Sequence, residues 1–295
     1  MANILEAGQT RVGRLLVAVT TVGWGLGWSM MKIVMNDWPP LFARGIAGLI
    51  AATGLAVIAV ARGENLVPPR ALFGPLVLGA ASNVFAWMGF TSLSLLWLHV
   101  SEAALLTFTM PIWATLLAWP VLGERPTLRT VVALCLGIAG LLLLMSGNLE
   151  GGINKLPGVM LALAAALLFA WGSVTSRGAI PLAQIVLTTW LIGLGSSAMV
   201  VAALMIETPA LASLTPAGMG ALAYLAIGPM ALCYLTWFGA IKRLPTATAS
   251  TGLLLVPIIG TLSAAVILGE PLGMREILAF ALTLGGVALE LRRPV

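Results

Sequence analysis

Two stretches of this chain, 146 residues apart, have nearly the same sequence. Residues 111–124 read PIWATLLAWPVLGE and residues 257–270 read PIIGTLSAAVILGE, so that eight of the fourteen positions are identical. The same shift, without a gap, lays Asn83 on Pro229 and Gly140 on Gly286. An internal repeat on this scale constrains the fold more than any local pattern does. The sequence therefore predicts two repeats, residues 1–150 and residues 151–295.

Both repeats are too apolar for a water-soluble protein. Hydrophobic residues make up 60% of the chain, charged residues 8%, and the mean hydropathy is +1.07, whereas soluble domains are roughly 25% charged. A span in lipid must satisfy its own backbone hydrogen bonds, which favours helices. We expect an all-α integral membrane protein with ten transmembrane helices, approximately Leu15–Met35, Leu41–Ala61, Leu72–Leu96, Val100–Leu122, Thr127–Met145, Val159–Ser176, Leu182–Ile206, Pro216–Ala240, Ala247–Leu268 and Leu272–Leu291.

The basic residues predict the orientation of these spans. With a cytoplasmic N-terminus, 11 of the 15 lysines and arginines fall on the cytoplasmic side, which places both termini in the cytoplasm. The four on the other side are Lys32, Arg44, Lys155 and Arg275. Five spans in each repeat is an odd number, so the two repeats should cross the membrane in opposite senses. Inverted repeats are typical of transporters. The segment 147–157 is the predicted linker between them.

Several classes of function find no support in the composition. The basic residues form no run or stripe, so no nucleic-acid partner is expected. His99 is the single histidine, and Cys135 and Cys233 lie alone in apolar stretches, which predicts no metal site and no cofactor. A membrane-embedded enzyme would need a nucleophile and base or a metal set. We therefore expect no enzyme, but a protein whose partners are a small-molecule substrate and the lipid bilayer.

Two repeated motifs carry a resemblance to a known family. A Trp-Gly pair occurs in the first predicted helix of each repeat, at Trp24-Gly25 and Trp171-Gly172, and Pro…LGE ends the fourth. With ten spans in two inverted fives, the chain resembles the EamA-type drug/metabolite transporter superfamily over essentially its whole length. It looks most like the bacterial exporters of amino acids, including aromatic ones. The resemblance implies a multi-pass exporter of the bacterial inner membrane, with a cavity lined by helices 1, 3, 4, 6, 8 and 9.

Polar and aromatic residues in the middle of the predicted spans are the candidate cavity residues. The third span carries Asn83, Trp87 and Thr91 at helical spacing on an otherwise apolar helix. The alternative is packing, or anchoring at the membrane interface, which suits Trp38, Trp97 and Trp119 near span ends better. The complete candidate substrate-binding set is Trp24, Asn83, Trp87, Thr91, Thr107, Trp171, Tyr234 and Trp237.

Pro111 and Pro257 are predicted to interrupt the fourth and ninth spans near their middles. A proline lacks an N–H and clashes with the preceding turn, so the carbonyls of Thr107 and Leu253 should lose their helical partners. The prolines would then serve as hinges, or a freed carbonyl with the Thr107 hydroxyl would accept a hydrogen bond from a substrate ammonium. The alternative is a kink that serves packing alone.

The carboxylates of Glu124 and Glu270 look like a symmetric pair. An inverted topology places them on opposite membrane faces, so they cannot act as one dyad. Each follows a glycine at a helix end, which favours a role in helix-end and turn chemistry.

The predicted spans contain no central charged residue. Glu102, Lys32, Arg44 and Arg177 fall near span ends, where side chains can reach the interface. Such an interior suits a zwitterion of no net charge. We therefore expect an exporter of small zwitterionic metabolites, above all amino acids with neutral or aromatic side chains, working by alternating access and facilitated diffusion. The alternative is a proton-coupled antiporter for hydrophobic drugs or other metabolites.

Overall fold

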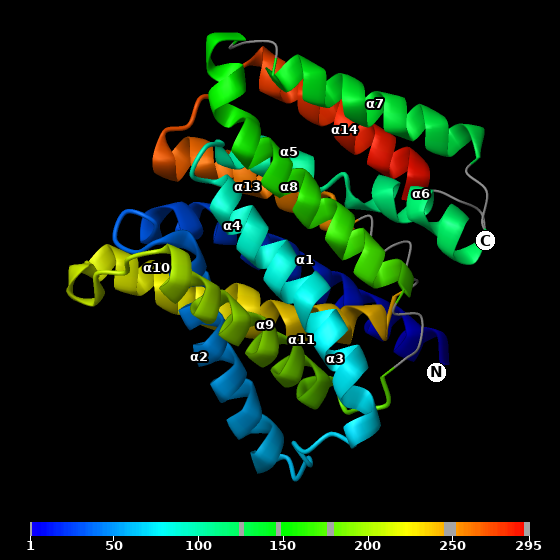
Figure 1. Cartoon of the computed structure of the whole chain (residues 1–295). Coiled ribbons are helices and arrows are strands. Elements are labelled where there is room, and N and C mark those ends of the chain that lie inside the picture. The colour runs from blue at the N-terminus through cyan, green and yellow to red at the C-terminus, as the bar shows by residue number, and fades with distance from the viewer. Residues whose placement is uncertain (1, 124–126, 146–148, 176–179, 245–251, 292–295) are drawn as a thin grey trace.

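The computed structural model describes residues 2–123, 127–145, 149–175, 180–244 and 252–291. In these ranges the chain folds into helices joined by short connections, and no strand occurs among them. The all-α fold predicted from the apolar composition is thereby confirmed. The N-terminal end of α1 (Ala2–Val34) and the C-terminal end of α14 (Met274–Leu291) lie at the same end of the bundle, on the right in Figure 1.

The helices of the two halves of the chain follow the same order. After α1 the first half contains α2 (Pro40–Ala61), η1 (Arg70–Leu72), α3 (Phe73–Ala80), η2 (Ala81–Gly89), α4 (Phe90–Ser94), α5 (Val100–Thr107), α6 (Met110–Leu122) and α7 (Leu128–Met145). Before α14 the second half contains α8 (Leu149–Thr175), α9 (Gln184–Ile206), η3 (Leu211–Ser213), α10 (Pro216–Ile227), η4 (Gly228–Leu232), α11 (Cys233–Ile241) and α13 (Leu255–Leu268).

Seven helices of the described chain are long and apolar enough to cross a membrane. They are Gln9–Val34, Pro40–Ala61, Arg70–Ser94, Val100–Leu122, Ile153–Thr175, Gln184–Ile206 and Pro216–Ile241. Two shorter apolar helices, Val131–Gly140 and Leu255–Leu268, accompany them. The exposed faces of the long and the shorter helices carry large aliphatic side chains such as Val57, Leu204 and Val266. Because lipid tails solvate such side chains, this surface suits a bilayer.

The first helix of each half packs among helices of the other half. α1 lies against α10, α11 and α13, while α8 lies against η2, α4, α5 and α6. Thr20 of α1 shares a 2.7 Å hydrogen bond with Thr236 of α11, and Ser29 shares one of 2.6 Å with Ser263 of α13. The two halves of the sequence are therefore interleaved, and each helix bundle contains segments from both.

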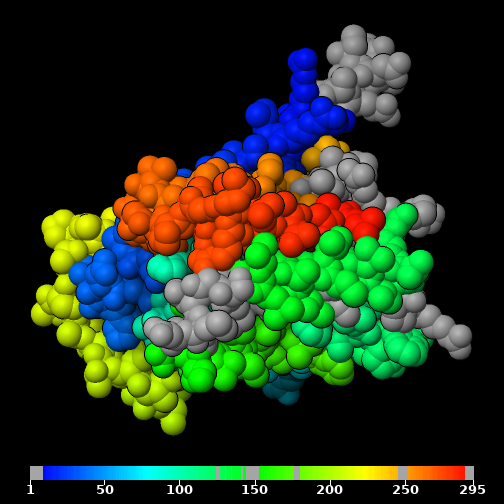
Figure 2. Space-filling view, turned by 90° about the horizontal axis from the view of Figure 1, so that it is seen from above, coloured from blue at the N-terminus to red at the C-terminus, as the bar shows by residue number. Residues whose placement is uncertain are grey.

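α7 and α14 form a pair of their own along one face of the molecule, at the top of Figure 1 and facing the viewer in Figure 2. Both begin and end at positions 146 residues apart. A Cβ atom at Gly140 would lie 2.8 Å from the carbonyl oxygen of Ala279, and one at Gly286 would lie 2.7 Å from that of Ala133. These paired contacts run in opposite directions along the two helices, so α7 and α14 are antiparallel. Small residues permit this close approach.

One sequence-based boundary is wrong. The segment 147–157 was expected to be a linker, but α8 is already helical from Leu149 and passes through Pro157. Pro157 lies in the third turn of α8, where its missing N–H removes one helical hydrogen bond. Lys155 is consequently held on a helix rather than in a loop.

Candidate functional site

The third helix of each half contains a π-helical segment. η2 occupies Ala81–Gly89 between α3 and α4, and η4 occupies Gly228–Leu232 between α10 and α11. A shift of 146 residues places η4 inside η2. A π-helical turn carries an extra residue, which rotates the following side chains relative to an α-helix, and such segments are frequent at functional sites. Several candidate residues lie on these segments or directly after them.

Around η4, an aromatic cluster joins α1 to α11. The ring of Trp24 lies edge-on to Tyr234 with centroids 5.7 Å apart, and 6.2 Å from the ring of Trp237. The Trp24 indole Nε1 donates a 3.0 Å hydrogen bond to the carbonyl oxygen of Pro229 in η4. All three rings are half-buried. Three residues of the candidate set, from distant parts of the sequence, are therefore in contact.

Around η2, a second aromatic cluster joins the third helix to α5 and α8. The centroid of Trp87 lies 4.7 Å from that of Phe169 and 6.2 Å from that of Phe108. Asn83, one turn before Trp87, is half-buried. Its side chain lies close to Gly172 of α8, since a Cβ atom built at Gly172 would be 3.5 Å from Asn83 Oδ1. Phe108 and Phe169 were not predicted from the sequence, since a lone phenylalanine in an apolar span carries no signal of its own.

The remaining candidates lie outside these clusters. The side chain of Trp171 is 44% exposed, and its ring joins neither cluster. Thr91 is buried and its hydroxyl donates to the carbonyl of Met88 at 3.1 Å. Thr107 is fully buried, and its hydroxyl donates to the carbonyls of Ala103 and Ala104 in its own helix. In this conformation both hydroxyl protons are therefore used locally.

Each of the two prolines lies just after a break in its span. The fourth span divides into α5 and α6 at residues 108–109, so that Pro111 lies in the first turn of α6. Pro257 lies in the first turn of α13, just after a break at Leu254. The predicted interruption of both spans is confirmed, although each proline lies in the first turn of the helix after the break, where its missing N–H would have no helical partner anyway. Each break nevertheless remains a place where the span can bend.

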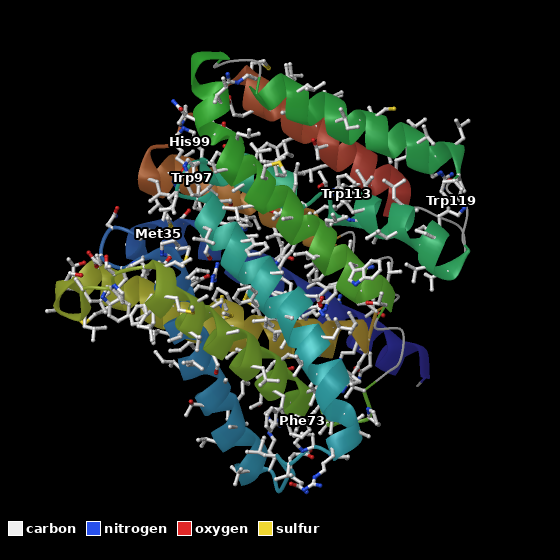
Figure 3. All side chains as sticks on the ribbon, in the orientation of Figure 1. Met35, Phe73, Trp97, His99, Trp113 and Trp119 are labelled. Atoms are coloured by element: carbon white, nitrogen blue, oxygen red, sulfur yellow. The ribbon has the colours of Figure 1, made fainter. Side chains whose placement is uncertain are left out.

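The tryptophans assigned to the membrane interface divide into two groups. Trp97 and Trp119 lie at opposite ends of the molecule with exposed side chains, as Figure 3 shows. Trp38, by contrast, is only 9% exposed, packs edge-on against Phe42, and donates from Nε1 to the carbonyl of Ala210 at 3.2 Å. The anchor role is thus wrong for Trp38, which joins α2 to the connection before η3.

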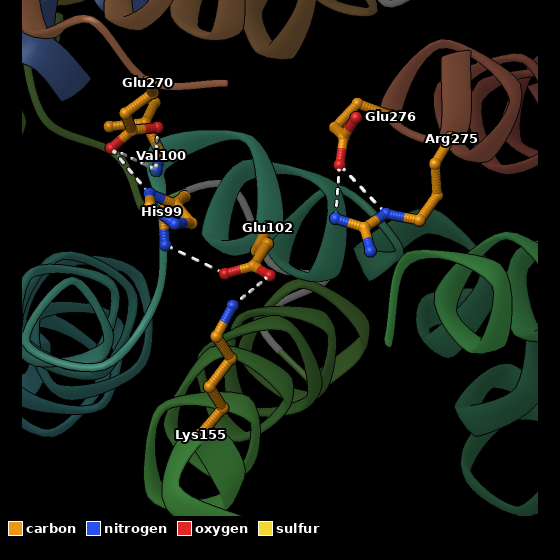
Figure 4. Close-up of polar contacts among 7 residues, drawn as sticks. All are labelled: His99, Val100, Glu102, Lys155, Glu270, Arg275 and Glu276. Atoms are coloured by element: carbon orange, nitrogen blue, oxygen red, sulfur yellow. Dashed lines mark hydrogen bonds and ion pairs between the residues drawn. The ribbon is translucent and has the colours of Figure 1, made fainter. Parts of the chain in front are cut away.

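Charged side chains meet at the end of the bundle where α5 begins (Figure 4). The Lys155 Nζ lies 2.6 Å from Glu102 Oε1, and Glu102 Oε2 accepts a 2.9 Å hydrogen bond from the backbone N–H of His99. Glu102 is only 8% exposed. The expectation that it reaches water at a span end is therefore wrong. A paired carboxylate in the first turn also stabilises the N-terminus of α5.

Glu270, the last residue of the second repeated motif, reaches the same helix end from another helix. Its carboxylate accepts hydrogen bonds from the backbone N–H of Val100, at 2.8 and 3.1 Å, and lies 3.6 Å from His99 Nδ1. The preceding Gly269 has a φ of 69°, so it ends α13 in the left-handed region as a turn glycine. The turn expected at Glu270 is confirmed, and in addition its carboxylate ties α13 to α5. Glu124 lies outside the described residues.

Arg44 lies deeper in the bundle than its position near a span end predicted. It lies in the second turn of α2, and its side chain turns into the bundle, where Nε donates a 3.0 Å hydrogen bond to the buried Ser92 hydroxyl. α2 itself packs against η4, the segment that leads into α11 and Tyr234. Arg44 was expected to extend to the membrane interface, and this expectation is wrong.

No group of three or more histidine, cysteine, aspartate or glutamate side chains in the described ranges has the geometry of a metal site. The chemistry that this arrangement offers is recognition rather than reaction: aromatic surfaces, hydroxyl and amide groups, and the Arg44 cation. The comparisons with known proteins agree with that description. The model of the EamA-like transporter family matches residues 11–146 and again 156–292.

The chain belongs to the EamA-like transporter family. It is therefore a multi-pass membrane protein and a transporter. The chain is 28% identical to a probable amino-acid metabolite efflux pump of Salmonella typhimurium, over 95% of this chain and 94% of the relative. It is 24% identical to the uncharacterized transporter YvbV of Bacillus subtilis, over 93% and 90% of the two chains. A protein solved by crystallography has the same fold, with a TM-score of 0.67 and 21% identity over 96% of both chains.

Proposed function

We propose that this EamA-family transporter exports small zwitterionic metabolites, chiefly amino acids with neutral or aromatic side chains, across a bacterial inner membrane. The observation that carries the proposal is the pair of aromatic clusters beside the two π-helical segments. Half-buried indole and phenol rings bind apolar or aromatic side chains by stacking while they keep a polar edge. The Salmonella relative, named as an amino-acid metabolite efflux pump, supports the same substrate class.

The substrate-binding set is Trp24, Asn83, Trp87, Thr91, Thr107, Trp171, Tyr234 and Trp237. Within it, Trp24, Tyr234 and Trp237 line one aromatic surface, and Trp87 beside Asn83 lines the other. An amide and backbone carbonyls near these rings would hold the ammonium group. Thr91 and Thr107 would contribute only after their helices move, because their hydroxyl protons are bonded locally in the present conformation.

The transport mechanism in this proposal is alternating access between two inverted five-helix repeats, residues 1–150 and 151–295, with ten spans and both termini cytoplasmic. Three observations support it: the helix order repeats, α7 and α14 pack antiparallel through equivalent glycines, and the helix ends at α1 and α14 coincide. Because α1 and α8 each pack in the other half, the bodies that rock would be mixed bundles. One contains α1 with α10, α11 and α13, the other α8 with η2, α4, α5 and α6.

The contact of Glu270 with Val100 joins these two bundles at one end of the molecule. In the proposed cycle this end opens when the carboxylate leaves the α5 N-terminus. The breaks at residues 108–109 and at Leu254, next to Pro111 and Pro257, would let the fourth and ninth spans bend during that step.

Substrate would move by facilitated diffusion, down its own gradient. A specific observation also favours a second candidate, a proton-coupled antiporter for hydrophobic drugs. Glu270 is a carboxylate of little exposure whose contact with Val100 joins the two bundles that the cycle would separate. Protonation of Glu270 would weaken a contact that holds one end closed, and that is the property that coupling requires.

One experiment separates the two candidates. The purified protein is reconstituted into liposomes, and uptake of labelled phenylalanine, leucine and the cationic dye ethidium is measured with and without an imposed pH gradient. The proposal predicts uptake of the amino acids at equal internal and external pH, and little uptake of ethidium. Uptake of ethidium that appears only with a pH gradient, without amino-acid transport, would support the antiporter instead.

A further inference from the structure

The proposed function leaves open how the transporter recognises the carboxylate of an amino acid. Arg44 is the residue of the described chain best placed to do this. It belongs to α2, a 22-residue apolar helix, and its side chain is half-buried. An arginine in a membrane-spanning helix is costly, and such residues usually face a partner or a substrate path.

Arg44 has no acidic partner within the described residues. Four described carboxylates are bonded elsewhere: Asp37 to Thr215, Glu102 to Lys155, Glu207 to the backbone N–H groups of Leu41 and Phe42, and Glu270 to that of Val100. Among described groups, Ser92 Oγ accepts the one hydrogen bond that Arg44 donates. A guanidinium group has five N–H donors, so its outer edge remains available to a ligand.

The surroundings of Arg44 resemble one end of a binding site for an aromatic amino acid. α2 packs against η4, the segment that ends shortly before Tyr234, and the Tyr234 ring contacts Trp24. The cation and the aromatic surface therefore lie on elements that pack together, α2 against η4 and α1 against α11. A planar guanidinium group binds a carboxylate through two parallel hydrogen bonds, which a lysine cannot reproduce.

We propose that Arg44, held by Ser92 on the helix that packs against η4, binds the carboxylate of the transported substrate. The inference rests on the proposed amino-acid transport and adds a requirement to it: the substrate must carry a carboxylate. The aromatic or aliphatic side chain then lies against the cluster of Trp24, Tyr234 and Trp237. Amino-acid amides and simple amines, which lack the anion, leave the guanidinium group unpaired and should be poor substrates.

The test compares matched substrates in liposomes that contain the purified protein. Labelled phenylalanine, phenylalaninamide and phenethylamine are offered to the wild-type protein and to Arg44→Gln, Arg44→Lys and Arg62→Gln. Arg62 is an exposed arginine at the opposite end of the same helix and serves as the control. Size-exclusion profiles and thermal unfolding in detergent establish that each variant is folded.

The wild-type protein and Arg62→Gln should prefer phenylalanine to both analogues. Arg44→Gln should raise the KM for phenylalanine by about tenfold or more, the loss expected for one charge-assisted pair. Transport of the amide by Arg44→Gln should change little, so the ratio of phenylalanine transport to amide transport should fall towards one. Arg44→Lys should give an intermediate ratio. Equal wild-type transport of phenylalanine and its amide would overturn the inference, even if Arg44→Gln did not fold. A wild-type protein that transports no amino acid at all would instead refute the proposed function.

Discussion

At the scale of single residues, the contacts of the tryptophans decide their roles better than their positions in the sequence do. Trp24 is half-buried, touches two other aromatic rings and donates to the carbonyl of Pro229. Trp119 is 53% exposed at one end of the molecule. Both residues follow an apolar run, and only the fold distinguishes them. Substitutions at the two positions should therefore have different effects.

We predict that Trp24→Ala lowers phenylalanine exchange in liposomes by about tenfold or more, since the loss of an aromatic partner typically costs about 1 to 3 kcal/mol of binding. Trp119→Ala should keep exchange within about twofold of the wild-type rate, because an interfacial ring acts mainly on placement in the bilayer. Rates are compared at equal amounts of reconstituted protein. Equal losses in the two variants would contradict the assignment of Trp24 to the substrate site.

At the scale of helices, the α7–α14 pair depends on close backbone contact. A Cβ atom at Gly286 would meet the carbonyl of Ala133, whereas one at its neighbour Gly285 would have nothing within 4 Å. The two adjacent glycines thus provide a test and its control in one helix.

Gly286→Ala should destabilise the protein by about 1 to 3 kcal/mol, the usual cost of overpacking, because the new methyl group would lie 2.7 Å from the Ala133 carbonyl oxygen. Gly285→Ala should be neutral or slightly stabilising, since alanine favours the helix and meets no neighbour there. Thermal unfolding of both variants in the same detergent measures the difference. An unchanged melting temperature for Gly286→Ala would show that the helices are not in close contact.

The carboxylate of Glu270 provides a second test at this scale. Glu270→Gln removes the charge at the α5 N-terminus and should weaken the closed contact with Val100. In a background that lacks Cys135 and Cys233, a Ser101→Cys substitution reports on this end, because Ser101 is only 3% exposed. Labelling by a membrane-impermeant maleimide should become severalfold faster with Glu270→Gln. It should not change with Glu64→Gln, which alters an exposed carboxylate elsewhere. Unchanged protection would rule out a closing role for Glu270.

The sequence predicted the apolar helices and the repeat because both are properties of continuous segments. It could not predict which segments meet across the bundle. The position of Arg44 was misjudged because its distance from the span end says nothing of Ser92, 48 residues later, which holds its guanidinium group inside. The burial of Glu102 likewise depends on Lys155, which itself depends on α8 beginning before Pro157. Tertiary contacts of this kind leave no local pattern.

At the scale of the whole molecule, the positions of the two chain ends bear on how the protein is oriented in the membrane. The first residues of α1 and the last of α14 lie at the same end of the bundle (Figure 1), opposite the ion pair of Glu102 and Lys155. The excess of basic residues predicts that the former end lies in the cytoplasm.

We therefore predict that tags at either terminus are reached by a protease only in inside-out membrane vesicles. A cysteine introduced at Ile153, an exposed residue near the start of α8, should be labelled only from the outside of intact cells. Labelling of the Ile153→Cys variant from the same side as the termini would mean that the assigned orientation of the helices is wrong.

The central claim, that this protein carries amino acids by exposing one site to each side in turn, is tested most directly by exchange across a liposome membrane. Labelled phenylalanine is added outside liposomes at equal pH on both sides, and its uptake is compared with and without unlabelled phenylalanine inside. In a carrier with alternating access, the binding site returns to the outer side faster when it holds substrate than when it is empty. Internal phenylalanine should therefore accelerate uptake severalfold. Uptake that is the same in both conditions, or no greater than in liposomes without protein, would contradict the account.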